Sequence, residues 1–186
     1  MGEPLDVINL HDIYDYHPGL TPAIAAHLLE GCSVTLHRKR HQKGKKVVIW
    51  GDQAVHLILD WAVEVNERTE RAWKDQNYAT EHAAVCLAIL FTLYFTGNRV
   101  MERSVRGTGF DYWIGSSDED NFQNKARLEI SGIFGGNKTD MLRVFYEKCN
   151  QTDKSDFTLL RAYVSVTEFS NLMSIYAKKD DNKRVT

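Results

Sequence analysis

The fold is decided by two apolar runs, RGTGFDYWIG at residues 106–115 and NKARLEIS at residues 124–131. Each run carries one carboxylate among aromatic and aliphatic residues, Asp111 in the first and Glu129 in the second. Burying an unpaired carboxylate in a strand costs free energy unless a partner or a metal ion compensates the charge. The two residues therefore predict a divalent-cation site on neighbouring strands.

Strand parity predicts which face each carboxylate occupies. Because side chains alternate along a strand, Asp111 shares a face with Trp113, and Glu129 shares a face with Lys125 and Arg127. If the two strands pair antiparallel, Asp111 and Glu129 lie side by side, where they repel unless a cation separates them. Oxygen ligands of this kind suit Mg²⁺ or Mn²⁺. Such an ion can activate water and stabilise the charge on a phosphodiester during hydrolysis.

The elements around this pair follow from spacing, capping residues and turn residues. In the N-terminal half we expect a helix that begins at Thr21 and runs to about His37, followed by a hairpin of strands 46–50 and 55–59. We then expect an amphipathic helix over residues 61–74, capped by Asp60. After a break near Asn77-Tyr78, an apolar helix Glu81–Thr96 is closed by Gly97. The first twenty residues show no clear period.

The C-terminal half has shorter elements. We expect strands 99–103, 110–114 and 125–131, the last ended by Gly132, then a helix 140–149 with Met141, Val144, Phe145 and Lys148 on one face, a polar loop 150–156, and a strand 159–169. A polar, acidic loop at residues 115–121 separates the second and third strands. From residue 81 the order is therefore helix, three strands, helix, strand.

The chain reads as one α/β domain with a mixed sheet, since 186 residues can bury a single sizeable core. We expect residues 1–76 to form an N-terminal helix-and-hairpin elaboration packed on a core of residues 77–177. The stretch after Tyr176 is expected to fray, with residues 178–186 forming a flexible tail.

The composition of the chain limits which classes of function and location we expect. The formal charge of −2 does not by itself favour nucleic acid, so any basic surface must be local. The three cysteines are scattered with no C-x-x-C pair, which argues against a disulfide framework and favours a reducing cytoplasm. The acidic N-terminus is not typical of a signal peptide, and the apolar window 83–95 is short for a membrane span. We therefore expect a cytoplasmic protein with no membrane partner.

The order of elements and the two carboxylates resemble the PD-(D/E)xK nuclease superfamily, whose pattern is G-x-D followed by E-x-K. Gly109-Phe110-Asp111 matches the first half, and Glu129-Ile130-Ser131 matches the second except at its last position. The resemblance implies a restriction-endonuclease-like αβββαβ core over residues 80–170. It implies that Asp111, Glu129 and the backbone carbonyl of Ile130 hold Mg²⁺ or Mn²⁺. The run GTGFDYW…NKARLEISG is also similar to a family of uncharacterised bacterial proteins.

Ser131 replaces the lysine that assists the attacking water in this superfamily. The resemblance points to another cation in that role, first Lys125, four residues earlier on the same face, and second Arg127. Glu81 is a candidate auxiliary metal ligand of the kind some relatives place on the preceding helix. It can equally be an acid favoured by the helix dipole.

Several alternatives stay open at this stage. Asp111 and Glu129 can be salt-bridged to Arg127, Lys125 or Arg161 without any metal. The resemblance implies a metal-dependent nuclease working with a protein partner or as a homodimer, with a role in bacterial defence by analogy alone. The departure at residue 131 favours instead a catalytically inactive module that binds nucleic acid or a partner protein. A toxin or immunity component acting by protein binding is a third possibility.

One basic segment is a candidate nucleic-acid surface. Residues 37–46 hold six lysines and arginines and no acid, namely Arg38, Lys39, Arg40, Lys43, Lys45 and Lys46. Such runs are often solvated surface, but they also contact phosphates. Nucleic-acid binding by this segment would weaken steeply with salt.

Overall fold

The computed structural model describes residues 4–15, 17–51, 54–116 and 125–179. Residues 52–53 of the expected hairpin turn, most of the expected acidic loop and the tail from residue 180 lie outside the described residues.

Helices and strands alternate irregularly along the chain. Their bounds are β1 Val7–Asn9, η1 Leu10–Tyr14, α1 Pro22–Arg38, β2 Lys45–Trp50, β3 Val55–Asp60, α2 Glu67–Ala72, α3 Gln76–Thr96, β4 Arg99–Arg103, β5 Tyr112–Gly115, β6 Lys125–Ile133, α4 Lys138–Gln151, η3 Thr152–Thr158, β7 Ala162–Glu168 and β8 Met173–Lys178.

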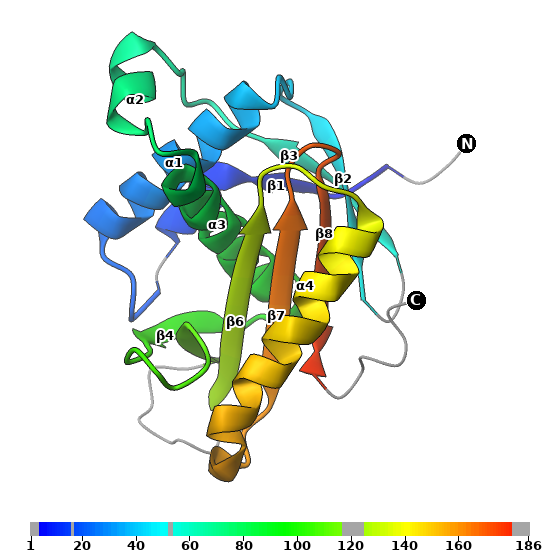
Figure 1. Cartoon of the computed structure of the whole chain (residues 1–186). Coiled ribbons are helices and arrows are strands. Elements are labelled where there is room, and N and C mark those ends of the chain that lie inside the picture. The colour runs from blue at the N-terminus through cyan, green and yellow to red at the C-terminus, as the bar shows by residue number, and fades with distance from the viewer. Residues whose placement is uncertain (1–3, 16, 52–53, 117–124, 180–186) are drawn as a thin grey trace.

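Among the described residues, eight strands form one mixed sheet in the order β1-β3-β2-β8-β7-β6-β5-β4 (Figure 1). β4, β5 and β6 are successive antiparallel neighbours, and β7 returns parallel to β6 after α4 crosses over. β8 pairs antiparallel with β7 and parallel with β2, so the N-terminal hairpin extends the same sheet. The expectation of a mixed α/β sheet is confirmed.

The helices cover the two faces of the sheet. α1 and α3 pack together on one face, and α4 lies across β6, β7 and β8 on the other (Figure 1). α3 begins after its N-cap Asp75 and ends at Gly97, whose φ of 68° is the left-handed conformation that glycine adopts readily. Among the described residues it is the helix long and apolar enough to cross a membrane, and it is mostly buried within the fold.

α4 owes its position to an amphipathic sequence. Asn137 caps it through a capping box with Asp140, and Met141, Phe145 and Cys149 are buried on its inner face. These side chains pack with apolar residues of β7 and β8 in a second core, separate from the larger core beneath α1 and α3. All three cysteines lie in the described part of the chain, and none forms a disulfide.

Several local predictions are confirmed. Thr21 caps α1, strands β2 and β3 form the expected antiparallel pair, and β4 matches its predicted range. The C-terminal cap of α3 at Gly97 is also as expected. Each of these depends on a local signal, a cap, a turn or a run of β-branched residues.

The prediction of a long amphipathic helix after Asp60 is wrong. Asp60 is the last residue of β3, where it pairs with Asn9 of β1. The helix there is the single short α2, capped by Asn66 through a capping box with Thr69. The expected break near Asn77-Tyr78 is wrong too, because α3 begins at Gln76, after its N-cap Asp75, five residues before the predicted start at Glu81.

Two strands were not expected at all. β1 lies in the N-terminal segment that showed no period, and its partner in the described sheet is β3. β8 lies between β2 and β7 and extends to Lys178. The prediction that the chain frays after Tyr176 is therefore wrong for residues 177–179. Residues 177–178 end β8, and the Lys179 ammonium pairs with Asp153 and Asp156. The partner of β1 and one partner of β8, the strand β2, are distant in sequence, whereas β8 also pairs with β7 just before it in the chain.

Candidate functional site

The register of β5 and β6 brings the two carboxylates together. Tyr112 lies opposite Leu128, so one further step places Asp111 opposite Glu129. The antiparallel pairing is as expected, but Asp111 lies one residue before β5 begins rather than inside it. Its backbone N–H donates to the Leu128 carbonyl at 2.9 Å, and its Oδ2 accepts from the Ile130 N–H, also at 2.9 Å. The side chain of Asp111 is therefore held against β6.

Two glycines allow the close approaches around this pair. Gly109 has a φ of 86°, and a Cβ there would collide with the Gln151 carbonyl at the end of α4. Gly132 lies inside β6, which continues past the predicted end because it stays paired with β7 as far as Ile133. The start of α3 lies close to it, since a Cβ on Gly132 would be 2.7 Å from the Thr80 carbonyl oxygen. The first glycine seats the loop that leads to Asp111 against α4. The second brings the first turns of α3 onto the strand that carries Glu129.

Glu129 is almost completely buried, with 1% of its surface exposed. Its Oε1 accepts a hydrogen bond from Lys148 Nζ at 2.6 Å. Its Oε2 is buried and receives no hydrogen bond from any described residue. A buried carboxylate oxygen without a donor is costly, and it marks this position as one that carries a function or a strain.

Lys148 is the residue that the sequence did not assign to the site. It lies on α4, and its ammonium also contacts Gln151 Oε1 at 3.2 Å. The signal was present in the spacing, because Lys148 shares the inner face of α4 with Met141 and Phe145. A lysine on the buried face of an amphipathic helix requires a partner, and Glu129 supplies it.

The environment raises the pKa of both carboxyl groups. Burial and the negative charge of Asp111 raise the pKa of Glu129 to about 7, although Lys148 opposes the shift. Burial also raises the pKa of Asp111, against the opposing effects of the Ile130 N–H and of Lys148. A carboxyl pair that exchanges a proton near neutral pH is typical of functional sites.

The raised pKa of Glu129 predicts a pH dependence of stability. Between its ordinary value of 4.5 and about 7, the folded chain binds more protons here than the unfolded chain. This carboxyl therefore stabilises the fold fully at low pH, and its contribution is lost as the pH rises through that window. Glu129→Gln does not titrate, so it should gain stability relative to wild type between pH values of about 5 and 8.

Urea denaturation of both proteins across this pH range measures the effect. The difference between the two proteins is the quantity to follow, because buried His17, whose pKa is lowered to about 4, contributes with the opposite sign in both. Glu147→Gln on the exposed side of α4 is the matched control and should follow wild type. A difference for Glu129→Gln that stays constant with pH would contradict the raised pKa.

The other expected cations lie elsewhere. Lys125 is the first residue of β6, opposite Gly115, about 13 Å along the strand from Glu129 at 3.3 Å per residue. It lines a different cavity together with Asn98 and Arg161. Among the described residues, the cation that contacts Glu129 is Lys148. The alternative of a salt-bridged carboxylate is thus realised with a partner that the sequence did not predict.

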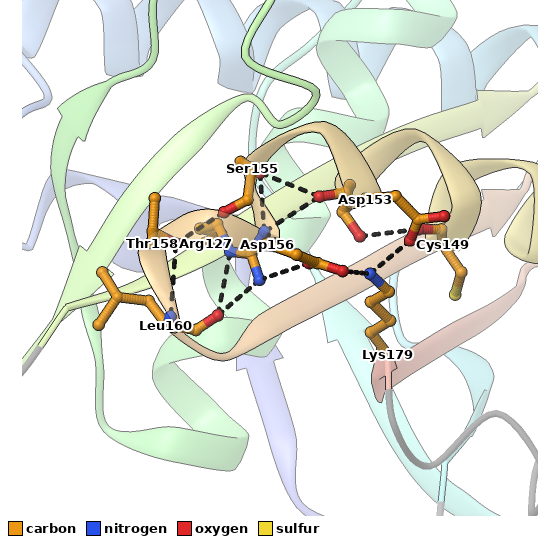
Figure 2. Close-up of polar contacts among 9 residues, drawn as sticks. Arg127, Cys149, Asp153, Ser155, Asp156, Thr158, Leu160 and Lys179 are labelled. Atoms are coloured by element: carbon orange, nitrogen blue, oxygen red, sulfur yellow. Dashed lines mark hydrogen bonds and ion pairs between the residues drawn. The ribbon is translucent and has the colours of Figure 1, made fainter.

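The Arg127 side chain has a structural role, because its guanidinium is hydrogen-bonded within the fold. Figure 2 shows its guanidinium inside the turn of η3, where it donates to Ser155 Oγ at 2.7 Å, to Asp156 Oδ1 at 3.1 Å and to the Leu160 carbonyl. Asp156 in turn pairs with Lys179, at the end of β8 (Figure 2). Arg127 therefore ties β6 to η3 and is not available to a substrate.

Two cavities meet at Asp111. The first, of about 360 Å³, is lined by Asp111 and Glu129 together with three cations, Arg103, Arg106 and Lys154. The second, of about 550 Å³, is lined by Asp111, Lys148, Arg103 and Glu81 and continues along α1 and α3. The carboxylates are thus surrounded by cations that project into open space. Glu81 faces the same cavity but forms no metal-binding group, since no cluster of three acidic, histidine or cysteine ligands occurs among the described residues.

The basic segment of residues 37–46 does not line either cavity. Arg38 is half-buried and pairs with Glu70 at 2.7 Å, and Lys39 contacts Ser170 Oγ and the Phe134 ring. Arg40, Lys43, Lys45 and Lys46 remain exposed. The segment and the carboxylate pair are therefore separate features of the surface.

Comparison of the chain with protein-family models, with curated proteins and with solved structures finds no match. The case for a function therefore depends on the geometry of the carboxylate pair.

Proposed function

We propose that this protein is a metal-dependent nuclease that hydrolyses phosphodiester bonds with Asp111, Glu129 and Lys148. The observation that carries the proposal is the buried carboxylate pair, held at one position of the sheet by strand register and contacted by a lysine at 2.6 Å. The order α3, β4, β5, β6, α4 and β7 is also the order expected of a PD-(D/E)xK core. In this interpretation the lysine missing at Ser131 is supplied by α4.

The donor set fits a hard divalent cation. Glu129 Oε2 has no donor among the described residues, and Asp111 lies opposite it. The Ile130 N–H points toward Asp111, and the carbonyl of the same residue lies on the same side of an extended strand. Asp111, Glu129 and the Ile130 carbonyl would hold Mg²⁺ or Mn²⁺. The ion, when bound, supplies Lewis-acid stabilisation of phosphodiester charge.

The remaining residues act on the substrate and the water. Arg103, Arg106 and Lys154 line the cavity beside the carboxylates, where they attract and orient a phosphate. The Lys148 ammonium, fixed by Glu129 and Gln151, holds a positive charge next to the position of the attacking water. Burial keeps this charge in a medium where its effect on the transition state is larger than in bulk water.

A catalytically inactive module with the same fold is the second candidate. The Glu129–Lys148 ion pair, together with the lack of a three-ligand cluster among the described residues, favours it. Such a module would bind nucleic acid or a protein partner through the cations around Asp111. A protein partner or homodimer, a role in defence and a cytoplasmic location stay predictions under either function.

Cleavage assays test the proposal. Labelled single- and double-stranded DNA and RNA are incubated with purified protein in Mn²⁺, in Mg²⁺ or in EDTA. We expect the protein to cleave them when either metal ion is present and not in EDTA. Lys148→Met should lower the rate about 100-fold or more, the scale of a lost catalytic acid, base or charge. Lys125→Met is the matched control and should cut like wild type.

Two outcomes would contradict the proposal. Binding of nucleic acid without any cleavage in either metal would favour the inactive module. Loss of cleavage in Lys125→Met with full activity in Lys148→Met would return the role of the missing lysine to β6.

A further inference from the structure

Four aromatic rings from three segments form a cluster beside the carboxylate pair, which we call the aromatic wall: His27 of α1, Trp73 after α2, and Tyr78 and His82 of α3. The centroids of Tyr78 and His82 are 4.1 Å apart, and those of His27 and Trp73 are 4.5 Å apart. Figure 1 shows α1 beside α3, with α2 lying above the start of α3. The rings are therefore brought together by tertiary packing.

The wall has a fixed base and an open surface. Trp73 is 2% exposed, its indole N–H donates to Glu30 Oε1 at 2.6 Å, and its ring packs on Gly31, where a Cβ would lie 2.7 Å away. His27 and Tyr78 are exposed, and His27 Nε2 and the Tyr78 hydroxyl are within hydrogen-bond distance at 3.1 Å. The buried tryptophan thus holds exposed rings in place.

The wall and Asp111 face one cavity. His27, Tyr78 and His82 line the second cavity together with Asp111 and Lys148, while Glu129 lines the adjoining first cavity. Burial and the neighbouring His82 lower the pKa of His27, which favours the uncharged form of its ring. The cavity therefore joins aromatic faces to a cationic and acidic centre, a combination that matches the two halves of a nucleotide, its base and its phosphate.

We propose that the aromatic wall stacks an unpaired base of single-stranded nucleic acid whose phosphate lies against Arg103 and Lys148, next to the carboxylate pair. This inference rests on the proposed function, since it assumes that the site takes nucleic acid. Bases within a duplex are covered by their neighbours, whereas unpaired bases stack readily on aromatic side chains. The wall therefore selects single strands, loops or frayed ends over intact duplex.

Binding measured without cleavage tests the inference. A fluorescein-labelled single-stranded oligonucleotide and its duplex are titrated with full-length protein in EDTA and low salt, with fluorescence anisotropy as the readout. A second single strand carries 2-aminopurine, whose emission is quenched when it stacks. Wild type should bind the single strand more tightly than the duplex and quench the 2-aminopurine.

The variants separate stacking from other contacts. Tyr78→Ala and His27→Ala should each weaken single-strand binding about tenfold, the scale of one stacked base, and reduce the quenching. Tyr78→Phe keeps the ring and should bind within about twofold of wild type. Tyr146→Ala, which removes a ring from α4 outside this cavity, should have no effect. Thermal melting of each variant shows that it is folded.

The outcomes distinguish this inference from the nuclease proposal. Equal binding of single strand and duplex, or unchanged affinity and quenching in folded Tyr78→Ala and His27→Ala, would overturn the stacking wall even if metal-dependent cleavage is observed. Quenching that is lost in these variants supports the wall even if no metal produces cleavage, in which case the nuclease proposal alone fails. No binding of single strands by wild type would overturn the wall.

Discussion

Asp111→Asn is expected to abolish metal-dependent cleavage by this protein, lowering the rate about 1000-fold or more. Loss of one charged ligand removes several kcal/mol of transition-state stabilisation, and each 1.4 kcal/mol is about a factor of ten in rate. The substitution is conservative for the fold, because an asparagine oxygen can still accept the hydrogen bond that Asp111 Oδ2 receives from the Ile130 N–H at 2.9 Å.

Stability should move the other way. Asp111 raises the pKa of Glu129 by its negative charge, so its removal relieves repulsion in a buried pair. The free energy of unfolding of Asp111→Asn should therefore equal or exceed that of wild type. A residue whose loss ends activity but not stability is the signature of a functional site.

Rates in Mn²⁺ and urea denaturation, measured on the same preparations, check both halves of this prediction. Glu147→Gln is the matched control, since it removes an exposed carboxylate next to Lys148 on α4. Cleavage by Asp111→Asn at the wild-type rate would remove Asp111 from the mechanism. Strong destabilisation would mean that its charge serves the fold.

Arg127→Met is expected to cost about 3 kcal/mol or more of folding stability. The Arg127 side chain is 4% exposed, and all three of its nitrogens donate hydrogen bonds. The Nη1 atom donates to the Thr152 carbonyl and Ser155 Oγ, and the Nε and Nη2 atoms donate to the Leu160 carbonyl. Methionine fills the volume but removes these donors from Ser155 Oγ and from the Leu160 carbonyl, while the Thr152 carbonyl keeps the Ser155 hydroxyl as a donor.

Urea denaturation at neutral pH measures this loss. Arg143→Met removes an exposed pair with Glu147, whose side chains are 62% and 60% exposed, and should change stability by less than about 0.5 kcal/mol. Arg127→Lys should recover little, because one ammonium cannot reproduce the planar fork of donors. Equal stabilities for Arg127→Met and Arg143→Met would show that the hydrogen bonds around η3 contribute nothing measurable.

The contrast between Lys125 and Lys148 shows how much of the candidate site could be predicted from the sequence. Alternation along β6 correctly placed Arg127 and Glu129 on one face, since both side chains project toward the side of the sheet that α4 and η3 cover. Sharing a face did not mean sharing a site. Lys125 is four residues away along an extended strand, and Arg127 is taken up by η3.

The aromatic wall could not be predicted from the sequence for a related reason. His27, Trp73 and Tyr78 come from α1, the segment after α2, and α3, and the predicted amphipathic helix over residues 61–74 placed Trp73 wrongly. Only the packing of α1 on α3, close at Gly31, brings these rings together.

The sequence by itself determined many of the local elements and the face of the sheet that carries the carboxylate pair. Period-two alternation and the turn glycines indicated that Asp111 and Glu129 lie on the same face, because strand parity depends on nearest neighbours alone. The tertiary structure decided which cation meets them. The distance between Lys148 and Glu129 depends on how α4 crosses the sheet, and this crossing is set by side chains of β7 and β8 that follow α4 in the chain. Long-range packing therefore determines that Lys148 is the cation that contacts the carboxylate pair, whose position local patterning had already indicated.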